Sequence, residues 1–322
     1  MNVTVLGDGA WGTACAALLA HNKHKVLLWC FNQDVERSIT LDRENATFLP
    51  GVKLPMSITA ITEVEEALEN DVVFQAVPVS HVRSVLTSCK PFARADHIWV
   101  SLSKGIESGS LFFPTDLIRD VLGSTTVCAA ISGPSFALDV AQKQLTVVAL
   151  AAEDEAVGAL VQKLVESKFL KCELSDDLSG IQVAGAFKNI FALGAGFLKG
   201  AGFGCNTQVF FVLKSLRELE VLLGAVAGHA QSLYGPAGLG DIMLTCFSEQ
   251  SRNMQAGVQL GAGKELKMVL ASGISTAEGI NTLVSVCALA QRLNIELSLC
   301  FALYNVIFKK ASVSQILDVL RG

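Results

Sequence analysis

The chain opens with MNVTVLGDGAWG, residues 1–12, in which Gly7, Gly9 and Gly12 spell G-x-G-x-x-G directly after an apolar run. A second strand-like run, residues 26–29, follows at the spacing of a βαβ unit of about 30 residues. In such a unit the first glycine permits a tight turn, the second lets a pyrophosphate approach the backbone, and the third lets helix and strand pack closely. The stretch therefore predicts a dinucleotide-binding loop at a helix N-terminus, with an ordinary strand-to-helix turn as the alternative.

The first half of the chain alternates short apolar runs with helical segments. Such alternation is typical of a parallel sheet covered by helices on its faces. The runs are apolar almost throughout, as expected for strands that are buried on both sides. The predicted strands are residues 3–6, 26–29, 72–77, 98–102, 127–131, 146–150 and 169–173.

After about Ser175 strand-like runs give way to apolar helical segments, predicted at residues 178–198, 209–230, 276–293 and 298–308. Asp176 and Asp177 favour a helix N-terminus there, because carboxylates accept backbone N–H bonds and oppose the helix dipole. The sequence thus predicts an α/β Rossmann domain, with a doubly wound and mostly parallel sheet, over residues 1–175. An all-α domain follows over residues 176–322.

Composition bounds the class of protein. The chain has 322 residues, of which 51% are hydrophobic and 17% charged, which favours two well-buried domains. The net charge of −5 shows no excess of the basic residues that nucleic-acid-binding proteins use to contact phosphates. Apolar stretches fall short of a membrane span. Nine cysteines without a C-x-x-C pair, and five scattered histidines, predict neither a disulfide framework nor a metal site. We expect a cytoplasmic protein, without a signal peptide, that binds a small molecule.

The choice between NAD and NADP is left open by the sequence. An acidic residue about 20 positions after the glycine loop would bind the 2′-hydroxyl of NAD. Residues 30–32 are Cys-Phe-Asn instead. Phe31 is a candidate for contact with the adenine, or a core residue. Asp34 and Glu36 lie just beyond, as does Arg37, which is able to meet a 2′-phosphate; each is also typical of a solvated helix surface.

Polar residues in otherwise apolar surroundings mark the candidate catalytic site. Lys104 follows a predicted strand at the sheet edge where ligands bind, although a solvated lysine is the commoner case. Lys188 lies within an apolar helix, where an ammonium group needs either a partner or a route to the surface. Asp241 and Thr245 share one helical face, so Asp241 is the candidate partner of Lys188. A helix N-terminus with a guanidinium and an amide, able to hold phosphate or carboxylate, is expected at Ser251, Arg252 and Asn253.

Eight motifs extend this pattern along almost the whole chain. They are G-x-G-x-W-G at 7–12, E-N-x-x-x-L-P-G at 44–51, A-V-P at 76–78, S-K-G at 103–105, S-G-P-S-F-A at 132–137, K-N at 188–189, G-L-G-D-x-x-x-T-C at 238–246 and S-R-N at 251–253. With these motifs the chain resembles the glycerol-3-phosphate dehydrogenase family, in its compact bacterial form dependent on NAD or NADP. The combination is far more specific than the glycine loop alone.

The resemblance implies an active site between the two domains, with Lys188 as the catalytic proton donor and acceptor. Expected substrate-contacting residues are Lys104, Gly133, Ser135, Lys188, Asn189, Asp241, Thr245, Ser251, Arg252 and Asn253. Expected cofactor-contacting residues are Gly7, Gly9, Ala10, Trp11, Gly12, Phe31, Lys104, Ala137, Arg252 and Glu278.

The implied reaction is hydride transfer between the nicotinamide and dihydroxyacetone phosphate, reducing it to glycerol 3-phosphate for phospholipid synthesis. Two departures from the family pattern stand out: Gly-Phe-Gly-Cys-Asn-Thr-Gln at residues 202–208, and the absence of a basic residue at Phe31 or Asn32. One alternative is a related two-domain dehydrogenase acting on a hydroxy acid. Another is a dinucleotide-sensing regulator without catalysis. The oligomeric state is open, with a homodimer among the alternatives.

Overall fold

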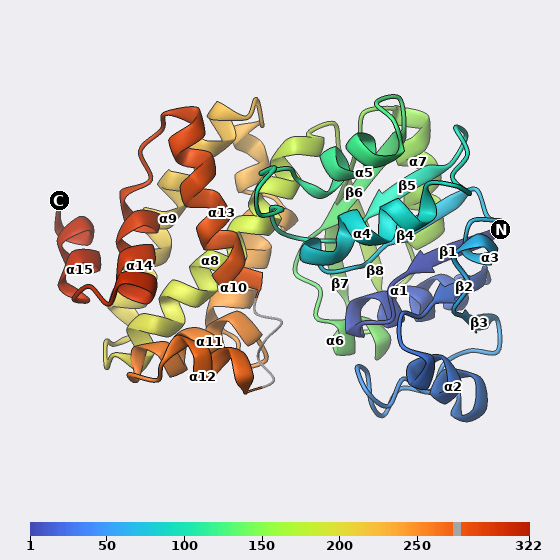
Figure 1. Ribbon diagram of the computed structural model, residues 1–322, viewed down its shortest axis with the longest axis horizontal. Helices are drawn as coiled ribbons and strands as arrows, with labels where there is room; N and C mark the ends of the chain where they lie inside the picture. Colours follow the sequence, from blue (N-terminus) through green and yellow to red (C-terminus); the bar gives the residue numbers. More distant parts are fainter. Residues whose placement is uncertain (273–277) are drawn as a thin grey trace. The chain divides into compact units, whose positions relative to one another are not determined.

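The computed structural model describes residues 1–272 and 278–322 as two compact units (Figure 1). The first consists of Met1–Ser103 and Pro114–Leu178, and the second of Lys104–Phe113 and Ser179–Gly322. Residues 104–113 therefore belong to the second unit, whereas the sequence analysis placed them in the first domain. Thr276, at the start of one predicted helix, lies outside the described residues.

The first unit is built on an eight-stranded sheet in the order β3-β2-β1-β4-β5-β6-β7-β8. Every neighbouring pair is parallel except β6 and β7. The strand order reverses direction between β1 and β4, where doubly wound sheets bind their ligands. The strands are β1 (Asn2–Leu6), β2 (Lys25–Trp29), β3 (Ile58–Ile61), β4 (Val72–Gln75), β5 (Ile98–Ser101), β6 (Val127–Ser132), β7 (Thr146–Ala152) and β8 (Leu170–Ser175).

All seven predicted strands are present, with ends shifted by at most two residues. The strand that was not predicted is β3, a four-residue edge strand that pairs with β2. Its sequence, ITAI, is too short to show a period. The mostly parallel sheet of the prediction is confirmed.

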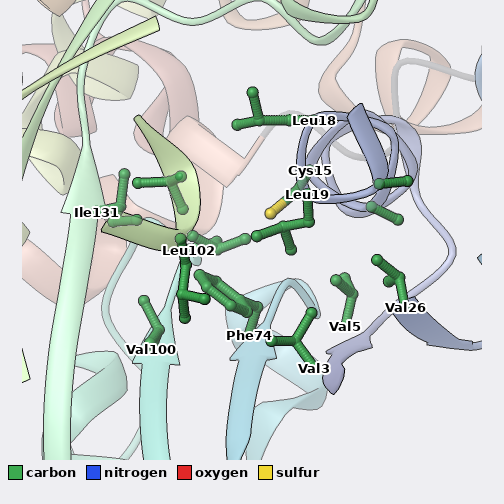
Figure 2. Close-up of a cluster of buried hydrophobic side chains, with 14 of the residues drawn as sticks. Val3, Val5, Cys15, Leu18, Leu19, Val26, Phe74, Val100, Leu102 and Ile131 are labelled. Carbon is green, nitrogen blue, oxygen red and sulfur yellow. The ribbon is translucent and has the colours of Figure 1, made fainter. Parts of the chain in front are cut away.

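Helices pack on the sheet in groups: α1 packs against α6, and α4 against α5. Figure 2 shows Cys15 and Leu19 of α1 facing Val5 and Phe74 on the sheet, in a cluster that continues to Ile131 on β6. This apolar contact fixes the angle at which α1 leaves the glycine loop. The helices of this unit are α1 (Ala10–His21), α2 (Gln33–Asp42), α3 (Val64–Ala67), α4 (Val79–Cys89), α5 (Pro114–Leu122), α6 (Ala137–Ala141) and α7 (Glu155–Val165).

The described residues of the second unit form helices and loops only, in agreement with the predicted all-α domain. The longest helix, α8, is apolar enough to cross a membrane, but 94% of its most apolar window is buried within the protein, as in a core helix. The elements are α8 (Leu178–Gly200), α9 (Cys205–Ala225), η1 (Ala230–Leu233), η2 (Pro236–Gly240), α10 (Asp241–Phe247), α11 (Arg252–Gly261), α12 (Leu266–Ala271), α13 (Glu278–Leu293), α14 (Ser298–Lys309) and α15 (Ser314–Arg321).

Helices α8 and α11 meet along a glycine seam, made of Gly196 and Gly200 on α8 and Gly257 and Gly261 on α11. A Cβ added at Gly196 would lie 2.2 Å from the carbonyl oxygen of Met254, and one at Gly257 would lie 2.1 Å from that of Leu193. The two backbones therefore touch directly, in the way that small residues spaced four apart allow. The seam places Met254, near the start of α11, beside Gly196 in the C-terminal half of α8.

Helix α9 ends at Ala225, five residues before the predicted end. Ala227 takes the left-handed conformation with φ +56°, and the N–H of Gly228 donates to the carbonyl of Leu223 at 2.8 Å. This is a Schellman ending in which alanine stands where glycine is usual. An apolar residue at the left-handed position hid the end of the helix from sequence analysis.

The N-terminus of α14 is capped from another helix. Glu218, on α9, accepts backbone N–H bonds from Leu299 at 2.5 Å and from Cys300 at 3.0 Å. The residue at the cap position, Leu297, has no side-chain hydrogen bond to the helix. Glu218 therefore satisfies two of the four N–H groups that a helix start leaves unpaired.

Candidate functional site

The glycine loop has the geometry that the G-x-G-x-x-G motif predicts. Gly7 has φ +122°, a conformation that L side chains rarely adopt, which allows the tight turn after β1. A Cβ on Gly12 would lie 2.0 Å from the carbonyl oxygen of Gly7, so helix and loop touch there. A Cβ on Gly9 would meet nothing within 4 Å, although Gly9 is the N-terminal cap of α1. The space in front of this helix N-terminus therefore fits a pyrophosphate that approaches the backbone.

The loop is held in place by Asn45, from the E-N-x-x-x-L-P-G motif. The fully buried carboxamide of Asn45 donates to the carbonyl of Asp8 at 2.8 Å and to the hydroxyl of Thr13 at 2.7 Å. Its own oxygen accepts the N–H of Phe48 at 3.0 Å. The motif is thus a clamp on the glycine loop. The motif alone does not indicate this role, because the contact joins residues 37 positions apart.

The carboxylate of Asp8 lies beside the end of β2. Its Oδ2 accepts the N–H of Asn32 at 3.2 Å, and the residue is only 9% exposed. Burial raises the pKa of this carboxyl above its ordinary value, and the backbone N–H groups around it, led by that of Asn32, offset part of the effect. The end of β2 thus carries a carboxylate that comes from the glycine loop.

A buried amide organises the carboxyl ends of β4 and β5. Gln75, with no exposed surface, accepts the hydroxyl of Ser103 at 3.0 Å and donates to the carbonyl of Val77 at 3.1 Å. The hydroxyl of Ser103 also donates to Val77. This network ties the A-V-P motif to the residue before Lys104. The role of Gln75 was not predicted, although a glutamine within an apolar strand is a signal for it.

Six more predicted residues lie in the first unit. Gly133 directly follows β6, and a Cβ there would lie 2.8 Å from the Cα of Val148, so no larger residue fits. The hydroxyl of Ser135 donates to the carbonyl of Gly133 at 3.0 Å. Ala137 is the first residue of α6, and Phe31 is 80% exposed after β2. Ala10 and Trp11 are the first two residues of α1.

The second unit brings Lys104, Lys188, Asp241 and Thr245 together, and we call these residues the lysine cluster. Asp241, the first residue of α10, is fully buried. Its Oδ1 accepts from Lys188 at 2.8 Å, and its Oδ2 accepts from Lys104 at 2.5 Å. Thr245, one turn along α10, donates to Oδ1 at 3.2 Å and accepts from Lys188 at 3.2 Å. The predicted pairing of Lys188 with Asp241 is present. The second lysine on the same carboxylate was not predicted.

The electrostatics of the lysine cluster follow from two ammonium groups on one carboxylate. The Lys104 and Lys188 side chains are 15% and 14% exposed. Burial, reinforced by the charge of Lys188 and opposed by Asp241 and Glu278, lowers the pKa of Lys104 from 10.5 to about 8. Burial would raise the pKa of Asp241, but the two ammonium groups together hold it below its ordinary value. The cluster is suited to an anionic ligand and to proton transfer.

The K-N and S-R-N motifs meet at the start of α11. The amide of Asn253 donates to the side-chain oxygen of Asn189 at 2.9 Å and accepts the N–H of Gly279, beside Glu278 at the start of α13, at 2.9 Å. Ser251 caps α11 by accepting the N–H of Met254 at 3.2 Å, as predicted for a residue that opens a helix. Arg252 is the exposed first residue of α11. The Arg252 side chain and the N-terminus of α11 therefore lie next to each other on the surface of this unit.

Comparison with known proteins places these two units in one family. Residues 2–158 match the family model of the NAD-dependent glycerol-3-phosphate dehydrogenase N-terminus, and residues 177–318 match that of its C-terminus. The chain belongs to the NAD-dependent glycerol-3-phosphate dehydrogenase family. The break between the two matches, residues 159–176, contains the end of α7 and all of β8.

Relatives and solved structures of this glycerol-3-phosphate dehydrogenase family cover the whole chain. The chain is 36% identical to glycerol-3-phosphate dehydrogenase [NAD(P)+] of Syntrophomonas wolfei, over 99% of this chain and 94% of the relative. It is also 36% identical to the Maricaulis maris enzyme of the same name, over 99% and 96%. The glycerol-3-phosphate dehydrogenase structure from Coxiella burnetii superposes with a TM-score of 0.95 at 29% identity, covering 100% of this chain and 99% of that one.

Proposed function

We propose that this protein interconverts dihydroxyacetone phosphate and sn-glycerol 3-phosphate with NADH or NADPH, and so supplies glycerol 3-phosphate for phospholipid synthesis. The observation that carries the proposal is the buried Asp241, which holds Lys104 and Lys188 on its two oxygens. Such a pair provides a proton donor and a second positive charge at one place. The names of the relatives support the substrate and the cofactor.

The glycine loop is the proposed site of the dinucleotide. Backbone N–H groups at the start of α1, from Gly9 to Gly12, would bind the pyrophosphate, since the space at Gly9 is open. Bound NAD(P)H supplies the hydride that reduces the carbonyl carbon of the substrate. Further residues proposed to contact the cofactor are Gly7, Ala10, Trp11, Phe31, Lys104, Ala137, Arg252 and Glu278.

Lys188 is the proposed general acid, which delivers a proton to the oxygen of the substrate carbonyl during reduction. Asp241 and Thr245 orient its ammonium group by hydrogen bonds of 2.8 and 3.2 Å. Lys104 adds positive charge as negative charge develops on that oxygen, and preorganised charge of this kind acts mainly in the transition state.

The start of α11 is the proposed phosphate site. Arg252 offers a planar fork of donors, and the helix N-terminus adds backbone N–H groups. Asn189 and Asn253 hold each other in place there. Gly133 and Ser135 are proposed to contact the substrate from the first unit. A firm grip on the phosphate would orient the reacting carbon.

We propose that residues 1–175 form the dinucleotide-binding domain, apart from residues 104–113, which fold with the second unit, and that residues 176–322 form the substrate and catalytic domain. We further propose that the protein is cytoplasmic.

An assay of NADH or NADPH oxidation tests the proposed reaction. Dihydroxyacetone phosphate should be reduced, whereas small 2-keto and 3-keto acids should not. Reduction of the keto acids alone would instead support a hydroxy-acid dehydrogenase, and binding of NADH without turnover of any substrate would support a sensor.

A variant of Lys188 tests its role in the same assay. Lys188→Ala should lower kcat by about 10²–10⁴-fold, the usual contribution of general acid catalysis, and leave NADH affinity nearly unchanged. The matched control is Lys199→Ala in the last turn of the same helix, where the side chain is 48% exposed and turnover should persist. Loss of NADH binding in Lys188→Ala, with the fold intact, contradicts the assigned role.

A further inference from the structure

The end of β2 decides which dinucleotide a βαβ unit accepts. In the usual arrangement an acidic residue there accepts a hydrogen bond from the 2′-hydroxyl of NAD, or an arginine meets the 2′-phosphate of NADP. This chain has neither kind of residue at positions 30–32. The side chain of Asn32 accepts the N–H of Asp34 at 2.8 Å as the cap of α2, so the oxygen of Asn32 is engaged within its own helix.

A carboxylate nevertheless lies at this end of β2, because Asp8 reaches it from the glycine loop. Oδ2 of Asp8 accepts the N–H of Asn32 at 3.2 Å. The backbone of Asp8 is fixed in turn, since its carbonyl accepts from the buried Asn45 at 2.8 Å and from Thr13 at 3.3 Å. The acid is therefore held in place by hydrogen bonds at both its side chain and its backbone.

The other charged residues near the end of β2 do not supply a cation for a 2′-phosphate. The first turn of helix α2 carries Asp34 and Glu36, and the one basic residue of the helix is Arg37. Arg37 is exposed on the face of α2 opposite Val35 and Ile39, the residues that pack on the sheet. Arg43, which follows α2, donates its guanidinium to the carbonyls of Pro55 and Ile58.

We propose that this protein selects NAD over NADP, with Asp8 as the selecting residue. The inference rests on the proposed binding of a dinucleotide at the glycine loop. The Asp8 carboxylate would accept a hydrogen bond from the 2′-hydroxyl of NAD. A 2′-phosphate would bring up to two more negative charges against it, and rejection by like charge is an effective source of specificity. Because burial already disfavours the ionised form of Asp8, as its raised pKa indicates, a hydroxyl donor relieves that cost and a phosphate adds to it.

Calorimetric titration of the whole protein with NADH and NADPH tests the selection without relying on turnover. We expect NADH to bind at least about tenfold more tightly, since a charge-assisted hydrogen bond is gained and a repulsion avoided. Asp8→Asn keeps an oxygen that accepts the Asn32 N–H but removes the charge, so the NADPH Kd should fall about tenfold and the preference should nearly vanish. The matched control is Asp42→Asn at the far end of α2, which removes one negative charge and should leave the preference unchanged.

A second variant keeps the test decisive if Asp8→Asn fails to fold. Phe31 is 80% exposed, so Phe31→Arg places a cation beside Asp8 without disturbing the core. It should improve NADPH affinity about tenfold. Titration with 5′-AMP and with adenosine 2′,5′-bisphosphate then confines the effect to the adenosine end. The parent protein should favour 5′-AMP and Phe31→Arg should favour the bisphosphate.

The outcomes separate this inference from the proposed function. If NADH and NADPH bind the parent protein equally well, or if both Asp8→Asn and Phe31→Arg leave their ratio unchanged, selection by Asp8 is wrong while dinucleotide binding stands. If neither dinucleotide binds the parent protein, the glycine-loop assignment and the proposed function fall together with the inference.

Discussion

At the scale of single residues, two glycines of the G-x-G-x-x-G loop have different roles. Gly12 is required by the protein's own backbone, because a Cβ would lie 2.0 Å from the Gly7 carbonyl oxygen. Gly9 is not required by the protein at all, since its φ of −64° is open to every residue and its Cβ would meet nothing within 4 Å. Its absence of a side chain therefore matters only to a ligand.

We therefore expect substitutions at these two glycines to have opposite effects on NADH binding and on stability. Gly9→Val should weaken NADH binding by at least about a hundredfold, because the side chain fills the pyrophosphate position, and leave thermal stability nearly unchanged. Gly12→Ala should destabilise the fold by about 1–3 kcal/mol through overpacking. Calorimetric titration and thermal unfolding of both variants measure the contrast. Unchanged NADH affinity in Gly9→Val would remove the pyrophosphate from this loop.

Lys104 predicts a pH dependence of catalysis. An ordinary lysine stays charged to about pH 10, whereas the pKa of Lys104 is about 8 in the lysine cluster. Its positive charge is therefore lost as the pH rises through 8, and kcat/KM for dihydroxyacetone phosphate, which reports the free enzyme, should decline over the same range.

The control for this prediction is Lys104→Arg, because arginine stays charged throughout that range. The variant should be less active at neutral pH but should lose the decline near pH 8. A profile that is flat from pH 7 to about 9.5 in the parent protein, or the same decline in Lys104→Arg, contradicts the assignment.

At the scale of elements, a side chain of one helix caps the N-terminus of another. Glu218 of α9 satisfies two N–H groups at the start of α14, so Glu218→Ala should lower the free energy of unfolding by about 1–3 kcal/mol. Glu218→Gln keeps one acceptor and should lose less. Denaturant unfolding of the parent and both variants gives the comparison, with exposed Glu220→Ala on the same helix as the control. Equal losses at Glu218 and Glu220 would show that the cap contributes nothing.

At the scale of the whole molecule, the sequence predicted what periodicity and local spacing determine. The strands of the sheet were recognisable because their apolar runs are nearly continuous, and the turn at Gly7 because its role is local. The pairing of Lys188 with Asp241 was predictable because an ammonium group in an apolar helix needs a partner. The meeting of Lys104 with the same Asp241 depends on residues 104–113 belonging to the second unit, which no local pattern indicates.

The site residues that escaped prediction act through contacts between distant parts of the chain. Asn45 and Asp8 lie far apart in sequence, and neither has a spacing that indicates the clamp on the glycine loop. Gln75 offered a signal, as a polar residue in the apolar strand β4, but its partners Ser103 and Val77 follow only from the packing of β4 beside β5.

The glycine seam between α8 and α11 has a consequence for mutations in the gene. A glycine codon altered at one base encodes another glycine, a stop, or a residue that carries a Cβ. At Gly196, Gly200, Gly257 and Gly261 any such Cβ falls within 2.0–2.2 Å of a carbonyl oxygen on the facing helix. Almost every missense allele at these codons must therefore push two helices apart, and with them the start of α11. Temperature-sensitive alleles of this gene should accumulate along that line.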